Sequence, residues 1–110
     1  RYAIERLIQL IIDLALDINN IILSSMEKPP ASDYFNSFID LIELNIFDHE
    51  FANNIAPSTG LRNRLVHEYE SIDDRIVYES IDKVIAFYSK YVSYINKSNL
   101  IWILNEANFY

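Results

Sequence analysis

The chain has 110 residues, of which 51% are hydrophobic, and it contains one glycine, three prolines and no cysteine. The lack of cysteine excludes disulfides, thiolate catalysis and cysteine-based zinc sites, and so few glycines and prolines leave little material for the turns of an all-β fold. The formal net charge of −7 argues against binding of nucleic acid by bulk attraction. A nucleic-acid site would need local positive charge, for which Arg62, Arg64 and Arg75 are the candidates.

The first predicted element is a helix from Tyr2 to about Met26. Its Ile, Leu and Ala residues recur every three or four positions, which is the period of a helix with one wide apolar stripe. Asp13, Asp17 and two asparagines interrupt the apolar run, which a membrane span rarely tolerates, and no signal peptide is recognisable. We therefore expect a cytoplasmic protein with no membrane partner.

Polar residues recur at every fourth position of this helix, at Glu5, Gln9, Asp13 and Asp17. Such residues lie along one face of a helix, and the simpler interpretation of the row is a solvated surface. The alternative interpretation is that Asp17 orients a basic group of an active site.

The rest of the pattern predicts shorter helices and one more long helix. Pro29-Pro30 ends the first helix because neither residue can continue its hydrogen-bond ladder. Ser32 or Asp33 is a suitable N-cap for the second helix, and Asp73 or Asp74 for the last one. The expected ranges are about 34–44, about 48–55, a helix that carries Arg62–His67 and ends near Tyr69, and about 75–96. Residues 1–110 are thus predicted to form one all-α domain, an antiparallel bundle of four to five helices.

The two long helices carry more apolar surface than so short a chain easily covers. Tyrosine, which is favoured in contact surfaces, is also frequent, at eight residues. We therefore predict a two-fold homodimer, with a monomer that exposes some apolar surface as the alternative. Tyr78, Tyr88, Tyr91 and Tyr94 are interpreted as packing or dimer-contact residues rather than as platforms for base stacking.

The side chains that carry chemistry gather in the stretch Arg62-Asn63-Arg64-Leu65-Val66-His67-Glu68-Tyr69. A guanidinium neutralises a phosphate and an imidazole moves protons near neutral pH, so Arg62 and His67 are suited to metal-free acid–base chemistry on a phosphodiester. Five positions rotate a side chain by about 140° on an ideal helix, so these two residues do not share a face. Asn63 does share a face with His67 and could steady the imidazole. A two-fold dimer would bring both copies of the cluster around one phosphate.

This stretch closely resembles the signature of HepT toxins in the HEPN superfamily: an Arg, a polar residue, three more positions, a His, one position and a Tyr. The similarity continues in Gly60-Leu61, in the run 72–78 and in the first 22 residues, and so covers nearly the whole chain. It implies a helical bundle that dimerises and acts as a metal-independent ribonuclease toxin on RNA. Because the family usually has a further helix before the stretch that matches Arg1, we expect an N-terminal helix to be missing here.

Carried over by position, the resemblance makes Arg62 and His67 catalytic and Asn63 their polar helper, with no metal and no cofactor. The implied reaction is transesterification, in which His67 takes the proton of the ribose 2′-OH and Arg62 stabilises the charge on the phosphate. In the family, a minimal nucleotidyltransferase antitoxin, MntA, silences the toxin by transferring AMP to the motif tyrosine, here Tyr69. Arg64 is interpreted either as a salt-bridge residue or as a residue that steers the phosphate.

Two functions of other classes stay open at this point. The same bundle could be a non-catalytic HEPN module that holds a nucleotide or a partner through Arg62 and Tyr69, which the acidic charge favours. It could also be a helical subunit that serves only as the regulated partner of a nucleotidyltransferase. Activity separates these functions from the nuclease.

Overall fold

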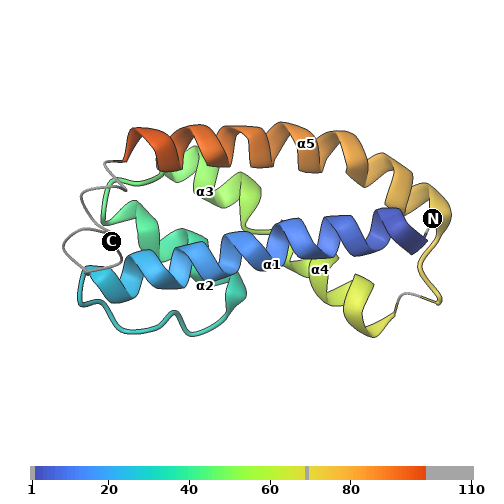
Figure 1. Ribbon diagram of the computed structural model, residues 1–110, viewed down its shortest axis with the longest axis horizontal. Coiled ribbons are helices and arrows are strands. Elements are labelled where there is room, and N and C mark those ends of the chain that lie inside the picture. Colours follow the sequence, from blue (N-terminus) through green and yellow to red (C-terminus); the bar gives the residue numbers. More distant parts are fainter. Residues whose placement is uncertain (1, 69, 99–110) are drawn as a thin grey trace.

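The computed structural model describes residues 2–68 and 70–98, and their regular structure is helical throughout (Figure 1). The elements are α1 (Tyr2–Ser25), α2 (Tyr34–Ile39), a 3₁₀ turn η1 (Asp40–Ile42), α3 (His49–Ile55), α4 (Ser58–His67) and α5 (Asp74–Lys97). The prediction of an all-α bundle of four to five helices is confirmed. Tyr69, the predicted site of AMP transfer, and the tail from residue 99 to 110 lie outside the described residues.

Three aspartates begin helices by accepting hydrogen bonds from backbone N–H groups that the first turn leaves unpaired. Asp33 accepts from Asn36 at the start of α2, and Asp48 accepts from Phe51 at the start of α3, both at 2.7 Å. Asp73 accepts from the N–H of Arg75 at 2.8 Å and caps α5. Of the two candidate N-caps predicted for α2, Ser32 and Asp33, the structure thus uses Asp33, and of Asp73 and Asp74 it uses Asp73 for α5.

The predicted second helix, 34–44, is shorter in the structure. α2 ends at Ile39, and the chain continues as the tighter turn η1. Asn45 then adopts a left-handed conformation, with φ of 59°, and the N–H groups of Asn45 and Ile46 bond back to the carbonyls of Ile42 and Leu41. Asn tolerates this conformation better than most residues, so it reverses the chain earlier than the apolar period suggested.

The two long helices lie side by side and run in the same direction, because the short helices between them carry the chain back (Figure 1). α4 runs antiparallel to α1. Its late residues Leu65 and Val66 line a pocket with Glu5 and Arg6, whereas its earlier residue Arg62 reaches Asp13. This direction brings the middle of α4 against the middle of α1, where the candidate site lies.

The core fills the space between α1 and the other helices. α1 is long and apolar enough to cross a membrane by length and composition alone, but its buried face is a central part of this core. Phe47 contacts Phe38, Phe51, Tyr91 and Tyr94 through its ring, in tilted and edge-on arrangements that aromatic pairs prefer. Residues that are completely buried include Ile12, Ile22, Phe38, Leu41, Ala52 and Ile55.

A chain of buried hydrogen bonds joins α5, α1 and α2. The hydroxyl of Tyr91 donates to the side-chain oxygen of Asn19 at 2.7 Å, and the amide of Asn19 donates to Ser37 Oγ at 3.1 Å. Ser37 Oγ in turn donates to the carbonyl of Tyr34 at 2.7 Å. A buried amide costs free energy unless it is paired, so this network fixes how α2 sits on the long helices. It also fixes the position of Tyr34, which contributes to the site.

Candidate active site

α4 carries four of the residues singled out in the sequence, Arg62, Asn63, Arg64 and His67. Pro57 precedes the first turn of this helix, where its missing N–H breaks no hydrogen bond. Thr59 and Leu65 are buried and attach α4 to the core, while Asn63 and His67 are exposed. α4 is therefore a short helix anchored by one face that presents polar side chains on the other.

Arg62 is held in place by three contacts. Its Nε donates to Asp13 Oδ1 at 2.6 Å, and its Nη1 donates to Asn63 Oδ1 at 3.2 Å. Its guanidinium carbon lies 5.1 Å from the centre of the Tyr34 ring, which is cation–π geometry. The side chains of Arg62 and Asp13 are only 18% and 32% exposed, so their attraction is screened less than at an open surface. Nη2 takes part in none of these contacts.

The carboxylate that orients Arg62 is Asp13 and not Asp17, the residue considered from the sequence. Asp17 lies one helical turn further along α1 and is exposed. The choice follows from where the antiparallel α4 crosses α1, which depends on packing rather than on the local pattern. Tyr34 was also missed, because a tyrosine at the start of a predicted helix gives no sign that it will face a residue 28 positions later.

His67 is the last residue of α4 and its side chain is exposed. Within residues 2–68 and 70–98, no hydrogen bond or ion pair occupies its imidazole. Because α4 stays helical through His67, the ring projects about 140° around the helix axis from Arg62. One copy of the chain thus holds the guanidinium against α1 and leaves the imidazole free on the outer surface.

Asn63 and Arg64 make local contacts that differ in part from expectation. From helical spacing Asn63 could steady His67; in this structure its amide oxygen accepts a hydrogen bond from Arg62. Arg64 lies 3.8 Å from Glu68, and both side chains are about half exposed. Such an exposed pair contributes little free energy, so it does not prevent Arg64 from turning to a phosphate.

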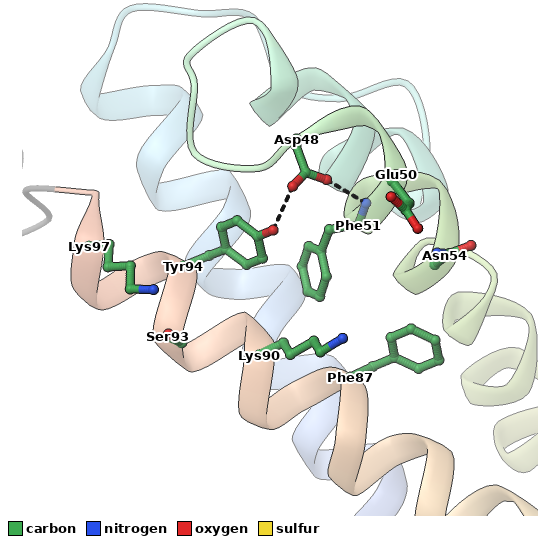
Figure 2. Close-up of a pocket in the computed structure, with 9 residues that line it drawn as sticks. All are labelled: Asp48, Glu50, Phe51, Asn54, Phe87, Lys90, Ser93, Tyr94 and Lys97. Atoms are coloured by element: carbon green, nitrogen blue, oxygen red, sulfur yellow. Dashed lines mark hydrogen bonds between the residues drawn. The ribbon is translucent and has the colours of Figure 1, made fainter.

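A separate pocket of about 360 Å³ lies between α3 and α5, at the opposite end of α5 from its start (Figure 2). Asp48 and Tyr94 face each other at its edge, and the Tyr94 hydroxyl donates to Asp48 Oδ2 at 2.6 Å. This bond lowers the pKa of Asp48, with help from the Phe51 N–H, and raises the pKa of Tyr94. The carboxylate therefore caps α3 and ties this helix to α5.

In residues 2–68 and 70–98, no three His, Cys, Asp or Glu side chains gather in a way that would hold a metal ion.

Comparison with known proteins identifies similar chains. A family model described as "Ribonuclease HepT-like" matches residues 1–95. A "tRNA nuclease HepT" of Aphanizomenon flos-aquae (strain 2012/KM1/D3) is 47% identical over 102 residues, which cover 93% of this chain and 69% of that protein. A "Putative RNase" of Archaeoglobus fulgidus is 35% identical over 81 residues, 74% of this chain and 61% of that protein. The chain thus spans roughly two thirds of the length of these relatives.

Proposed function

Because this chain belongs to the HepT-like ribonuclease family, we propose that it is a metal-independent endoribonuclease that acts as the toxin of a toxin–antitoxin pair in the cytoplasm. The observation that carries the proposal is the state of two side chains on α4. Arg62 is oriented by Asp13 and Tyr34, and His67 is exposed and unengaged among the described residues. These are the groups that phosphodiester cleavage without a metal requires.

The proposed reaction is an attack of the ribose 2′-oxygen on the neighbouring phosphorus. His67 takes the 2′-OH proton, the bond from phosphorus to the 5′-oxygen breaks, and an acid protonates that oxygen as it leaves. Arg62 stabilises the negative charge that builds on the non-bridging oxygens, with Asn63 holding one side of the guanidinium. The products are a 2′,3′-cyclic phosphate and a free 5′-hydroxyl.

We propose that a two-fold homodimer completes this site. One chain directs Arg62 and His67 to different sides of α4, so a second copy must supply the missing group near the phosphate. α1 offers a surface for this purpose, a stripe of exposed apolar residues in which Leu7 and Leu14 are 59% and 61% exposed. The other members of the stripe are Leu10, Ile11 and Ile21. The stripe borders the row that contains Asp13, and its pairing would bury apolar area and place two α4 helices near each other.

Regulation is proposed to act on Tyr69. An MntA-like nucleotidyltransferase antitoxin would transfer AMP from ATP to this hydroxyl, with release of pyrophosphate. The tyrosine follows His67 by two positions in the sequence, so a bulky anion attached to it would hinder the approach of RNA to His67 and repel the substrate phosphate. Incubation with such a partner and ATP should add the mass of AMP to Tyr69. Labelling of a Tyr69→Phe protein at another residue would contradict this assignment.

The nuclease is tested with purified protein and RNA in the presence of EDTA. We expect cleavage that leaves 2′,3′-cyclic phosphate ends, and a loss of cleavage with the chelator would exclude the metal-free mechanism.

The dimer is tested by light scattering on Leu14→Glu, which should give a monomer that no longer cleaves. Ile85→Glu is the matched control, because this residue is 60% exposed and belongs to α5 and not to the α1 stripe. A monomer that cleaves RNA normally would exclude the shared site.

The second candidate is a non-catalytic module that binds a nucleotide or a partner protein. The separation of Arg62 and His67 within one chain favours it, as does the net charge of −7. Expression in cells distinguishes the two functions. Growth arrest that His67→Ala relieves supports the nuclease, whereas unchanged growth supports the binding module.

A further inference from the structure

A pocket of about 450 Å³ lies between the second half of α1 and the connection that leads into α2. Its volume lies in the range of small-molecule sites in proteins. Tyr34 lines this pocket, and the same ring faces the Arg62 guanidinium at 5.1 Å. Tyr34 is 45% exposed, and it links Arg62 to this neighbouring cavity because it contacts the first and lines the second.

Three polar side chains that line the pocket have hydrogen-bonding groups unused within the described part of the chain. They are the amide of Asn20, the hydroxyl of Ser24 and the ammonium of Lys28. All three are exposed. In contrast, Asp33 also lines the pocket, but its carboxylate is already engaged by the N–H and the side-chain amide of Asn36, at 2.7 and 2.9 Å. The free groups are thus a donor–acceptor amide, a hydroxyl and a cation.

The placement along α1 connects these groups to the candidate active site. Asp13, which holds Arg62, and Asn20 are seven residues apart, so they lie on nearly the same face of α1 and about 10 Å from each other along its axis. A nucleotide whose phosphate contacts Arg62 would therefore extend its base toward Asn20. The network Tyr91–Asn19–Ser37 holds the backbone of Tyr34, whose ring forms the aromatic wall of the pocket.

We propose that this pocket binds the nucleobase of a nucleotide that flanks the scissile phosphate of RNA, and this inference rests on the proposed nuclease function. The base stacks against Tyr34, as bases do on aromatic side chains of proteins that bind single-stranded RNA. The amide of Asn20 reads the edge of the base, because an amide offers both a donor and an acceptor. Lys28 contacts the next phosphate along the strand. The pocket thereby gives the nuclease a base preference.

The first experiment measures binding and does not depend on cleavage. Full-length His67→Ala protein is titrated with AMP, CMP, GMP and UMP, and its amide signals are followed by NMR. We expect the signals of Asn20 and of residues 32–34 to shift, and one base to bind more tightly than the others. Inorganic phosphate should leave the Asn20 signal unchanged. If all four nucleotides leave these amide signals essentially unchanged, the proposal is wrong.

The second experiment uses Asn20→Ala, which removes an exposed side chain and should fold normally. Affinity for the preferred nucleotide should fall about 10-fold, and the difference between bases should shrink. Asn54→Ala is the matched control, since Asn54 is an exposed asparagine on α3 that lines other pockets. It should bind the nucleotides as the parent does. An Asn20→Ala protein with the parent's base preference would exclude base reading at this residue.

The third experiment maps the sites at which the wild-type protein and the Asn20→Ala protein, both with His67 intact, cleave a pool of RNA with random sequence. The wild-type protein should prefer one base beside the cut, and Asn20→Ala should lose that preference. If the wild-type protein binds nucleotides at Asn20 but cuts no RNA, the nuclease function fails and the base pocket stands. If it cuts RNA and Asn20→Ala keeps the same preference, the nuclease function stands and the base pocket fails.

Discussion

The buried polar side chains between α1, α2 and α5 differ from the polar side chains on α4 in how many of their hydrogen-bonding groups are used. Asn19 is completely buried, and its amide donates to Ser37 and accepts from Tyr91. His67 on α4 is exposed and bonds to none of the described residues. The hydrogen-bonding groups of the buried set thus find their partners within one chain, whereas those of the α4 set do so only in part.

This difference separates groups that maintain the fold from groups that meet a ligand. A buried group that lost its partner would cost free energy, so Asn19, Ser37 and Tyr91 are constrained by the fold itself. An exposed imidazole is satisfied by water and gains nothing for stability from its position. Arg62 stands between the two cases, since Asp13 fixes its Nε while Nη2 takes no part in the contacts that orient it. Substitutions in the two sets should therefore have opposite effects on stability and on activity.

The largest effect is expected for His67→Ala, through activity alone. Loss of a general acid–base group typically lowers the rate by about 10²–10⁴-fold, and both roles fall to His67 if a dimer forms the site. The free energy of unfolding should change by less than about 0.5 kcal/mol, since the side chain is exposed. Cleavage kinetics and urea denaturation measure the two quantities. A protein that loses activity because it unfolds would place His67 with the structural set.

The opposite result is expected for Asn19→Ala. The substitution removes two buried hydrogen bonds and leaves a small cavity, so the free energy of unfolding should fall by about 3 kcal/mol. Asn54→Ala on the surface of α3 is the control and should change it by less than about 0.5 kcal/mol. Urea denaturation of both proteins, followed by circular dichroism, measures the difference. Equal stability of the two variants would show that the buried network contributes little.

The comparison also shows which parts of the structure could be predicted from the sequence. The helices and their caps depend on neighbouring residues, and so Pro29-Pro30, Asp33 and Asp73 placed them correctly. The end of α2 was missed because Asn45 reverses the chain through a left-handed conformation, which the apolar period does not reveal. Patterns of neighbouring residues thus predict which segments are helical better than they predict where each helix ends.

The contacts of the site depend on tertiary packing, which the local pattern does not contain. Asp13 and Arg62 are 49 positions apart. The acidic row offered Asp13 and Asp17 one helical turn apart, and only the crossing of α1 and α4 selects between them. Asn63 was assigned to His67 by helical spacing, but the longer reach of Arg62 brings the guanidinium to it first. The roles in catalysis of Arg62, Asn63, Arg64 and His67 stay predictions.

A pH-dependent effect distinguishes the buried phenols from exposed ones. Burial raises the pKa of Tyr88 from 10.0 to about 12, while its hydrogen bond with Ser58 acts in the other direction. Above pH 10 the unfolded chain releases this proton and the folded chain keeps it, so the free energy of unfolding should fall until about pH 12. A shift of about two units corresponds to a loss on the order of 2 to 3 kcal/mol.

Denaturation curves at several alkaline pH values test this effect, with Tyr88→Phe as the comparison. The variant should lose stability less steeply above pH 10, because its ring has no proton to release. Burial also raises the pKa of Tyr91, so part of the decrease should remain in the variant. Identical pH profiles for the two proteins would show that Tyr88 is as accessible as a surface tyrosine.

The smallest effect is expected for Asp13→Ala, which tests the residue that links the two sets. Without its carboxylate, Arg62 keeps its charge but loses the hydrogen bond that orients it, so kcat should fall about 10-fold while KM changes little. Asp17→Ala is the matched control, because it removes a carboxylate one turn away on the same helix and should leave kcat within about twofold. Asp13→Glu should restore part of the rate if orientation is the cause. If instead both alanine variants raise kcat/KM equally, the acidic row acts only by repelling RNA, and Arg62 needs no partner to hold it.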